Sequence, residues 1–149
     1  MKLLRAVLAL LAASAAVPGA WASFAPRSFY ASFPGAGHHW VDRLGPFNAH
    51  LIADVGAFYL AFAVLLAWGA VRPAPAFVVP AAAAWSLFSG LHLHFHATHT
   101  HPLPSADALA QTVSLAAALA GGLAVLALSA RRGTPPAGPS CRPRRRSGS

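Results

Sequence analysis

The chain has 149 residues, of which 56% are hydrophobic and only 9% are charged. A soluble domain carries about 25% charged residues, so these few charges exclude a small soluble globule. Cys141 is the single cysteine, which excludes an intrachain disulfide and CxxC metal motifs. We therefore expect an all-α, polytopic membrane protein whose helices are surrounded by lipid.

The first apolar run covers residues 3–22 and follows Lys2. Its basic start and its Ala20-Trp21-Ala22 ending are typical of a cleaved signal peptide. About 20 apolar residues also suffice to cross the hydrocarbon layer of a bilayer, with Trp21 as an interfacial anchor. Both interpretations stay open, and we favour an uncleaved first span.

Residues 23–50 form the only sizeable loop, and they hold too many aromatic side chains for a free linker. We expect this loop to lie on the outer membrane interface or to cap the bundle. Three more apolar runs are each long enough to span a membrane, and none alternates as a barrel strand would. They cover residues 51–71, 77–97 and 106–130.

These runs predict a transmembrane bundle of four helices within residues 1–132. Residues 133–149 contain mainly Gly, Pro, Ser and Arg, with almost nothing to bury, and they predict a disordered basic tail.

Basic residues predict the orientation of the bundle. With the N-terminus inside, the outer segments hold only Arg27 and Arg43. We therefore expect a protein of the cell membrane with both termini in the cytoplasm. The tail should contact anionic lipid head groups, and we expect no nucleic-acid partner. The basic residues on the cytoplasmic side would be Lys2, Arg5, Arg72, Arg131, Arg132, Arg142, Arg144, Arg145 and Arg146.

This topology places every histidine and every acidic side chain on the outer side. His92, His96 and His99 follow an i, i+4, i+7 spacing, which predicts that they share one helix face. His50 and Asp54 are also one turn apart. An ionisable residue inside a span is energetically costly and usually faces a partner or a cavity. We therefore expect Asp54 and His92 to face the bundle interior.

One functional interpretation of this cluster is a divalent metal site, because imidazole and carboxylate suit zinc or copper. The candidate ligands are His92, His96 and Asp54, with His50, His99 and Asp107 as secondary candidates. His94 and His101 lie on another face, so we expect them to be dispensable.

Two other interpretations stay open: a polar network at the helix ends, which we favour, and a proton or pH-sensing role. Haem is disfavoured because the second span offers only His50 as a ligand, at its edge.

The sequence contains no GxSxG, P-loop or HExxH motif, so no catalytic residue is assigned. The leading function is therefore a non-enzymatic membrane protein, acting as a subunit or accessory factor of a membrane protein partner. One alternative is a metal-binding or redox-linked protein with its site at the outer face. A second is a small transporter, which the one-sided distribution of intramembrane charges disfavours.

Several short segments of the chain carry a family resemblance: Ala25-Pro26-Arg27-Ser28-Phe29-Tyr30, Phe33-Pro34-Gly35, Trp40-Val41, Asn48-Ala49-His50-Leu51, Asp54-Val55-Gly56-Ala57, His92 and Phe95-His96. They resemble a group of small four-helix membrane proteins of high-GC Gram-positive bacteria, loosely similar in layout to DoxX-like proteins. The resemblance covers about residues 1–130 and implies four spans with an uncleaved first one, but no activity, cofactor or catalytic residue. Ala49 stands where that group is expected to have a glutamate, which argues against a catalytic Asn-x-His segment.

Overall fold

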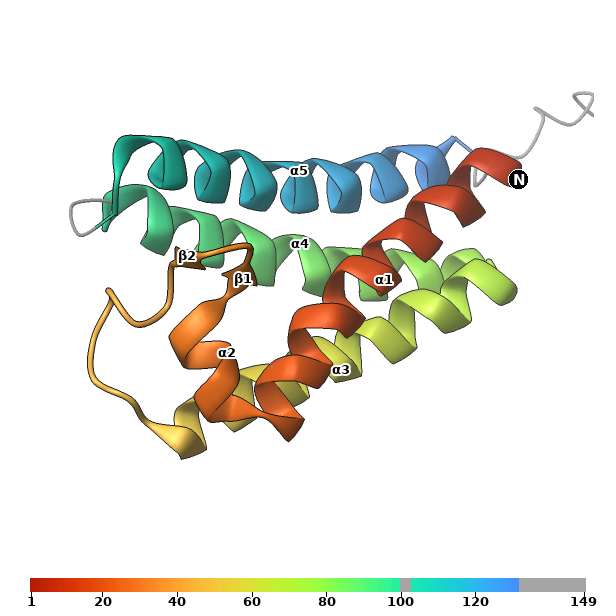
Figure 1. The fold of residues 1–149 in the computed structure, drawn as a ribbon. Helices are drawn as coiled ribbons and strands as arrows, with labels where there is room; N and C mark the ends of the chain where they lie inside the picture. Colours follow the sequence, from red (N-terminus) through yellow and green to blue (C-terminus); the bar gives the residue numbers. More distant parts are fainter. Residues whose placement is uncertain (100–102, 132–149) are drawn as a thin grey trace, which may run out of the picture.

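The computed structural model describes residues 1–99 and 103–131 (Figure 1). In this part of the chain, helices account for most residues and a two-stranded hairpin for a few. The predicted tail of residues 133–149 lies outside the described residues. In chain order the elements are α1 (Lys2–Phe24), α2 (Pro26–Ser32), β1 (Pro34–Gly35), β2 (His38–His39), α3 (Ala49–Val71), α4 (Pro75–Thr98) and α5 (Ser105–Ala130).

The helices α1, α3, α4 and α5 are each long and apolar enough to cross a membrane. Each begins and ends within a few residues of the span predicted for it. The all-α fold with four membrane-spanning helices is therefore confirmed, and the protein is a multi-pass membrane protein. Successive long helices run in opposite directions, so α1 begins at the end of the bundle where α5 finishes (Figure 1).

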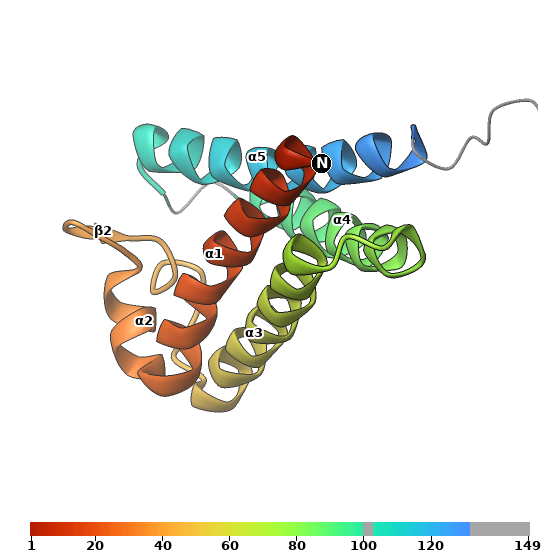
Figure 2. The same ribbon diagram turned by 90° about the vertical axis from the view of Figure 1, so that its right-hand side faces the viewer.

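The four long helices form two pairs, because α1 packs mainly on α3 and α4 mainly on α5. The pairs approach each other near the start of α1 and the end of α5, and they diverge toward the other end (Figures 1 and 2). We call these the closed end and the open end of the bundle. The segment containing α2 and the hairpin lies at the open end (Figure 1).

The closed end holds a tightly packed aliphatic core. Among the described residues, it contains the largest fully buried side chains apart from Trp85, which lies nearer the middle of α4. The early turns of α1 and α4 meet the late turns of α3 and α5 there, because successive helices run in opposite directions. The buried aliphatic side chains are Leu4, Leu8, Leu66, Val78 and Val125.

A close crossing of α1 and α3 brings these helices together toward the open end. A Cβ atom added at Gly56 would lie 2.6 Å from the backbone nitrogen of Ser23 and 2.9 Å from the carbonyl oxygen of Gly19. Only glycine leaves room for that approach, and small residues serve this purpose widely in membrane helix pairs. The crossing fixes one wall of the open end.

The segment between α1 and α3 is folded rather than extended. The Tyr30 hydroxyl donates a hydrogen bond of 2.8 Å to the carbonyl oxygen of Gly45. The Tyr30 ring also meets Phe47 edge-on, with ring centroids 5.3 Å apart. Asn48 then caps α3, because its side chain accepts a hydrogen bond from the backbone nitrogen of Leu51. This aromatic segment covers the open end, consistent with its predicted role as a cap.

Candidate functional site

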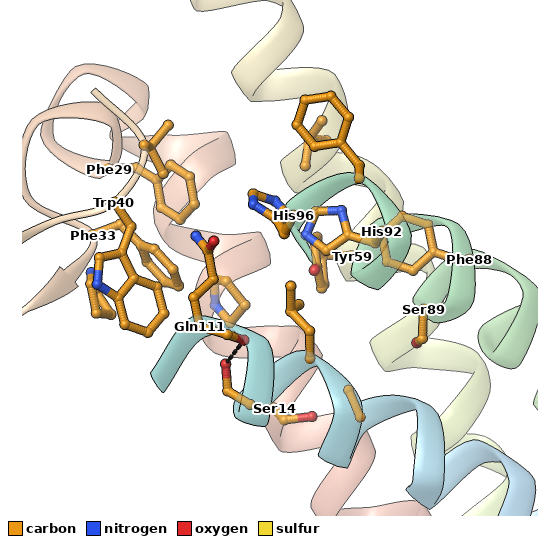
Figure 3. A pocket seen from close by; sticks show the side chains of 18 of the residues that line it. Ser14, Phe29, Phe33, Trp40, Tyr59, Phe88, Ser89, His92, His96 and Gln111 are labelled. Carbon is orange, nitrogen blue, oxygen red and sulfur yellow. Dashed lines mark hydrogen bonds between the residues drawn. The ribbon is translucent and has the colours of Figure 1, made fainter. Parts of the chain in front are cut away.

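A pocket of about 740 Å³ lies at the open end, between the two helix pairs and beneath the folded segment (Figure 3). Its volume falls within the range of about 300–1,000 Å³ that is typical of small-molecule sites. All four long helices contribute to the lining, as do α2 and the loop around the hairpin. Its polar lining residues are Ser14, Tyr59, Ser89, His92, His96, Gln111 and Ser114.

Aromatic rings form much of the pocket wall. On the side of the folded segment, Phe33 packs against Phe29 at 4.7 Å and against Trp40 at 6.0 Å between ring centroids. Across the pocket, Tyr59 of α3 meets Phe88 of α4 edge-on at 5.2 Å. Aromatic walls of this kind bind apolar and planar groups well, through area burial and ring contacts. The lining is therefore suited to an apolar molecule.

His92 and His96 lie side by side on the pocket-facing side of α4 (Figure 3). Their ring centroids are 4.6 Å apart, and His92 stacks on Phe88 at 5.5 Å. The prediction that these two histidines share a face and that His92 points inward is confirmed. His94 is exposed on another side of α4 and does not line the pocket.

His99 does not join them, so the prediction of a shared face over three histidines is wrong. The helix α4 ends at Thr98, and His99 has left the helical conformation. Its ring stacks on Phe95 at 4.2 Å, and its Nδ1 lies 2.8 Å from the carbonyl oxygen of Phe95. Because the helix ends before it, His99 does not line the pocket with His92 and His96. His101 lies outside the described residues.

Asp54 faces away from the bundle interior, so its predicted inward orientation is wrong. Its side chain is 53% exposed, and its Oδ2 lies 3.3 Å from Nε2 of the exposed His50. The buried side of α3 carries Ile52 and Gly56 instead. Asp54 is two residues, or about 200° of helix rotation, from each of these, which places it on the opposite side.

The other two aspartates pair with the hairpin or with its neighbouring loop. Asp107 Oδ1 lies 2.7 Å from His38 Nδ1, which ties the first turn of α5 to β2. Asp42 Oδ2 lies 3.3 Å from His39 Nδ1. All three carboxylate side chains of the protein therefore pair with histidines other than His92 and His96.

The predicted ligand set is thus divided between separate places. The pocket holds His92 and His96, whereas Asp54 and His50 form an exposed pair, and Asp107 binds the hairpin. Over residues 1–99 and 103–131, no group of three or more His, Cys, Asp or Glu side chains is arranged to hold a metal ion. The carboxylate–histidine pairs correspond to the polar network expected at the helix ends.

Gln111 is a site residue that the sequence interpretation did not assign. It lies in the second turn of α5, is only 5% exposed and extends toward His96 across the pocket (Figure 3). Three polar atoms of the lining are buried and have no hydrogen-bond partner: Gln111 Oε1, His96 Nδ1 and Trp40 Nε1. The signal available in the sequence was an amide side chain within an otherwise apolar span.

Three other polar groups of the lining, those of Ser14, Ser114 and Trp85, are already satisfied within the protein. The hydroxyl of Ser14 donates to the carbonyl oxygen of Leu11 at 2.9 Å, and that of Ser114 donates to the carbonyl oxygen of Gln111 at 2.8 Å. Trp85 Nε1 donates to the carbonyl oxygen of Ala118 at 3.0 Å, deep in the pocket. The unpartnered atoms therefore lie toward the end of the pocket near the folded segment.

No Asp, Glu, Lys or Arg belongs to the lining as far as the chain is described. An isolated charge is strongly disfavoured in a low-dielectric cavity unless a counter-charge accompanies it. The pocket can therefore accommodate a neutral molecule with a small polar group. Comparison with protein-family models, with curated proteins and with solved structures finds no match, so the function is argued from the residues of this chain.

Proposed function

We propose that this protein is a non-enzymatic, multi-pass membrane protein that binds a neutral lipid in the pocket at its open end. The observation that carries the proposal is a pocket of about 740 Å³ among membrane-spanning helices, lined by aromatic rings and by uncharged polar groups. Buried polar groups in proteins nearly always have partners. The buried Oε1 of Gln111 and Nδ1 of His96, which lack hydrogen-bond partners, therefore support a bound molecule with a polar group of its own.

A lipid is favoured over a water-soluble molecule by the surroundings of the pocket. The surrounding helices are apolar enough to lie in the bilayer, where apolar molecules concentrate. A phospholipid or fatty-acid anion is disfavoured, since its phosphate or carboxylate would find no Lys or Arg among the described lining residues. The packed closed end supports binding rather than transport, because large aliphatic side chains fill it.

Lipid extraction from purified protein tests this proposal. Mass spectrometry of the extract should find a neutral lipid in near-stoichiometric amount. The variant Val55→Phe places a ring into the pocket lining on α3 and should reduce that amount at least several-fold. Val64→Phe is the matched control, because Val64 is 68% exposed on the same helix and lies outside the pocket. A wild-type extract without neutral lipid, or equal lipid in both variants, would refute the proposal.

We also propose the cytoplasmic orientation of both termini, supported by the distribution of basic residues. Reporter fusions after residues 35, 74, 103 and 140 should read outside, inside, outside and inside. A cytoplasmic result at residue 35 would reverse the assignment and place the open end inside.

The first span is proposed to remain uncleaved in the mature protein. Leu4, Leu8 and Ala15 of α1 are almost completely buried against the other helices, so cleavage would expose much of the core. N-terminal sequencing of the purified protein should start at the beginning of α1, at Met1 or Lys2. A mature N-terminus at Ser23 would contradict this and leave three spans.

A transition-metal site is a second candidate function, because the His92 and His96 rings are adjacent in the pocket. Two imidazoles one helical turn apart can form half of a zinc or copper site. His96→Ala should then abolish metal binding, whereas His94→Ala should not, as His94 lies outside the pocket. Elemental analysis after incubation with zinc or copper decides it: wild-type protein that retains neither metal ends this candidate.

The role as an accessory subunit and the likeness to DoxX-like proteins stay predictions. Contact of the basic tail with anionic lipid also stays a prediction, since most of the tail arginines lie outside the described residues.

A further inference from the structure

Two unpartnered polar side chains on facing helices define where the head of a lipid would lie. Resting on the proposed lipid-binding function, we infer that the ligand is a neutral lipid with a hydroxyl head group. Its hydroxyl lies between Gln111 of α5 and His96 of α4, and its hydrocarbon chain extends toward Trp85.

The side chain of Gln111 carries a buried hydrogen-bond acceptor. Its side chain is 5% exposed, and its Oε1 is a buried acceptor without a donor. Leaving such a group unsatisfied is energetically costly, and lipid offers no water to satisfy it. A bound molecule that donates a hydrogen bond to the amide would satisfy this acceptor. Esters, ethers and ketones accept hydrogen bonds but cannot donate them.

The ring of His96 carries a buried nitrogen that faces the same region of the pocket. Its Nδ1 is buried without a partner, and a neutral imidazole carries one donor and one acceptor nitrogen. The amide of Gln111 likewise combines donors with an acceptor. A hydroxyl group matches both side chains, because it donates one hydrogen bond and accepts others.

The depth of this pair restricts the size of the head group. Gln111 is six residues into α5, or about 9 Å along the helix from Ser105. Residues of the folded segment, including Phe33 and Trp40, line the pocket near this pair (Figure 3). A single hydroxyl fits such a covered position, whereas a sugar or phosphate head would need far more polar surroundings.

The remainder of the pocket suits a hydrocarbon chain. Trp85 lines that part of the pocket, and its Nε1 already donates to the Ala118 carbonyl oxygen. The hydrocarbon chain would lie mainly against the apolar and aromatic side chains of the lining, such as Val55 and Phe88.

Binding of three probes with the same chain tests the inference. Wild-type protein in phosphatidylcholine nanodiscs is titrated with 1-hexadecanol, with its methyl ether and with hexadecane, and binding is followed by tryptophan fluorescence. We expect the alcohol to bind about tenfold more tightly than the ether, since one unmade hydrogen bond to a buried group corresponds to roughly that factor. Equal affinities would overturn the hydroxyl inference and leave the proposed lipid binding intact. Failure of every probe, together with lipid-free purified protein, would refute both.

A pair of variants tests whether the preference for the alcohol over the ether depends on the amide of Gln111. Gln111→Leu should retain binding of the ether and lose the preference for the alcohol. Thr112→Val is the control, because the Thr112 hydroxyl donates to the Ala108 carbonyl within α5 and lies outside the pocket. It should keep the full preference. If Gln111→Leu fails to give a monodisperse protein, His96→Phe against His94→Phe provides the same comparison. An alcohol preference that survives both pocket substitutions would exclude this pair as the head site.

Discussion

The closed and open ends of this bundle are formed by the same four apolar helices, yet one end is tightly packed and the other contains a pocket. At the closed end, Leu8, Leu66 and Val125 are almost wholly buried against one another's helices. At the open end, aromatic side chains of the folded segment line a pocket that the helices alone do not fill.

The difference shows that apolar composition alone does not fill an interior. Medium-sized aliphatic side chains interlock where two helix pairs converge, because they fill the space between neighbouring turns. Large rings such as Phe29 and Phe33 contact one another at a tilt and leave space between the diverging helix pairs. One end therefore holds the packed core, and the other holds the pocket.

The largest effect should come from removing volume at the closed end. Leu66 is completely buried, so Leu66→Ala should lower the free energy of unfolding by about 2–5 kcal/mol. Leu51→Ala is the counterpart at the open end, where Leu51 lines the pocket and is 59% exposed, and it should cost much less. Unfolding in mixed detergent measures both. Equal losses would mean that the two ends do not differ in packing.

The next largest loss of stability should come from a substitution at the crossing of α1 and α3. Gly56→Ala places a Cβ 2.6 Å from the Ser23 nitrogen, so the helices must separate, at a cost of about 1–3 kcal/mol. Gly90→Ala is the matched control, since the nearest atom to its added Cβ is 4.0 Å away, on Leu119. It should be neutral or stabilise α4, because alanine favours helix. Thermal unfolding monitored by circular dichroism distinguishes the two variants, and a neutral Gly56→Ala would contradict the close crossing.

In protein freed of lipid, Gln111→Leu should raise the free energy of unfolding, whereas the two preceding variants should lower it. Replacing a buried, unpartnered amide by a side chain of similar size removes a desolvation penalty, so the lipid-free variant should be more stable than the wild type by about 1 kcal/mol. Adding 1-hexadecanol should then stabilise the wild type more than the variant. A destabilised lipid-free variant would show that the amide makes structural interactions instead.

The smallest loss of stability should come from disrupting the ion pair between His38 and Asp107. Asp107→Asn weakens the link between the hairpin and α5, but His38 is about half exposed, so the loss should stay within about 1 kcal/mol. Its consequence should be local: hydrogen exchange should rise across residues 33–47 and remain unchanged at the closed end. Asp54→Asn, which alters an exposed pair on α3, should leave that segment unaffected.

The sequence by itself determined the four spans and the clustering of histidines at one end. Long apolar runs can satisfy their backbone hydrogen bonds in lipid only as helices, so composition and length suffice to locate them. The pairing of His92 with His96 also followed from helical periodicity, because both residues lie within one unbroken helix.

Only the tertiary structure decided which side of each helix faces inward and which groups meet. The helix α3 is apolar around its whole circumference, so its sequence carried no signal that Asp54 faces outward. The ending of α4 at Thr98 left His99 outside the pocket lining, packed on Phe95. Likewise, the approach of Gln111 to His96 depends on how two helices, joined through residues outside the described range, pack against each other. Such contacts between separate helices arise from the divergence of the two pairs, which no local sequence pattern encodes.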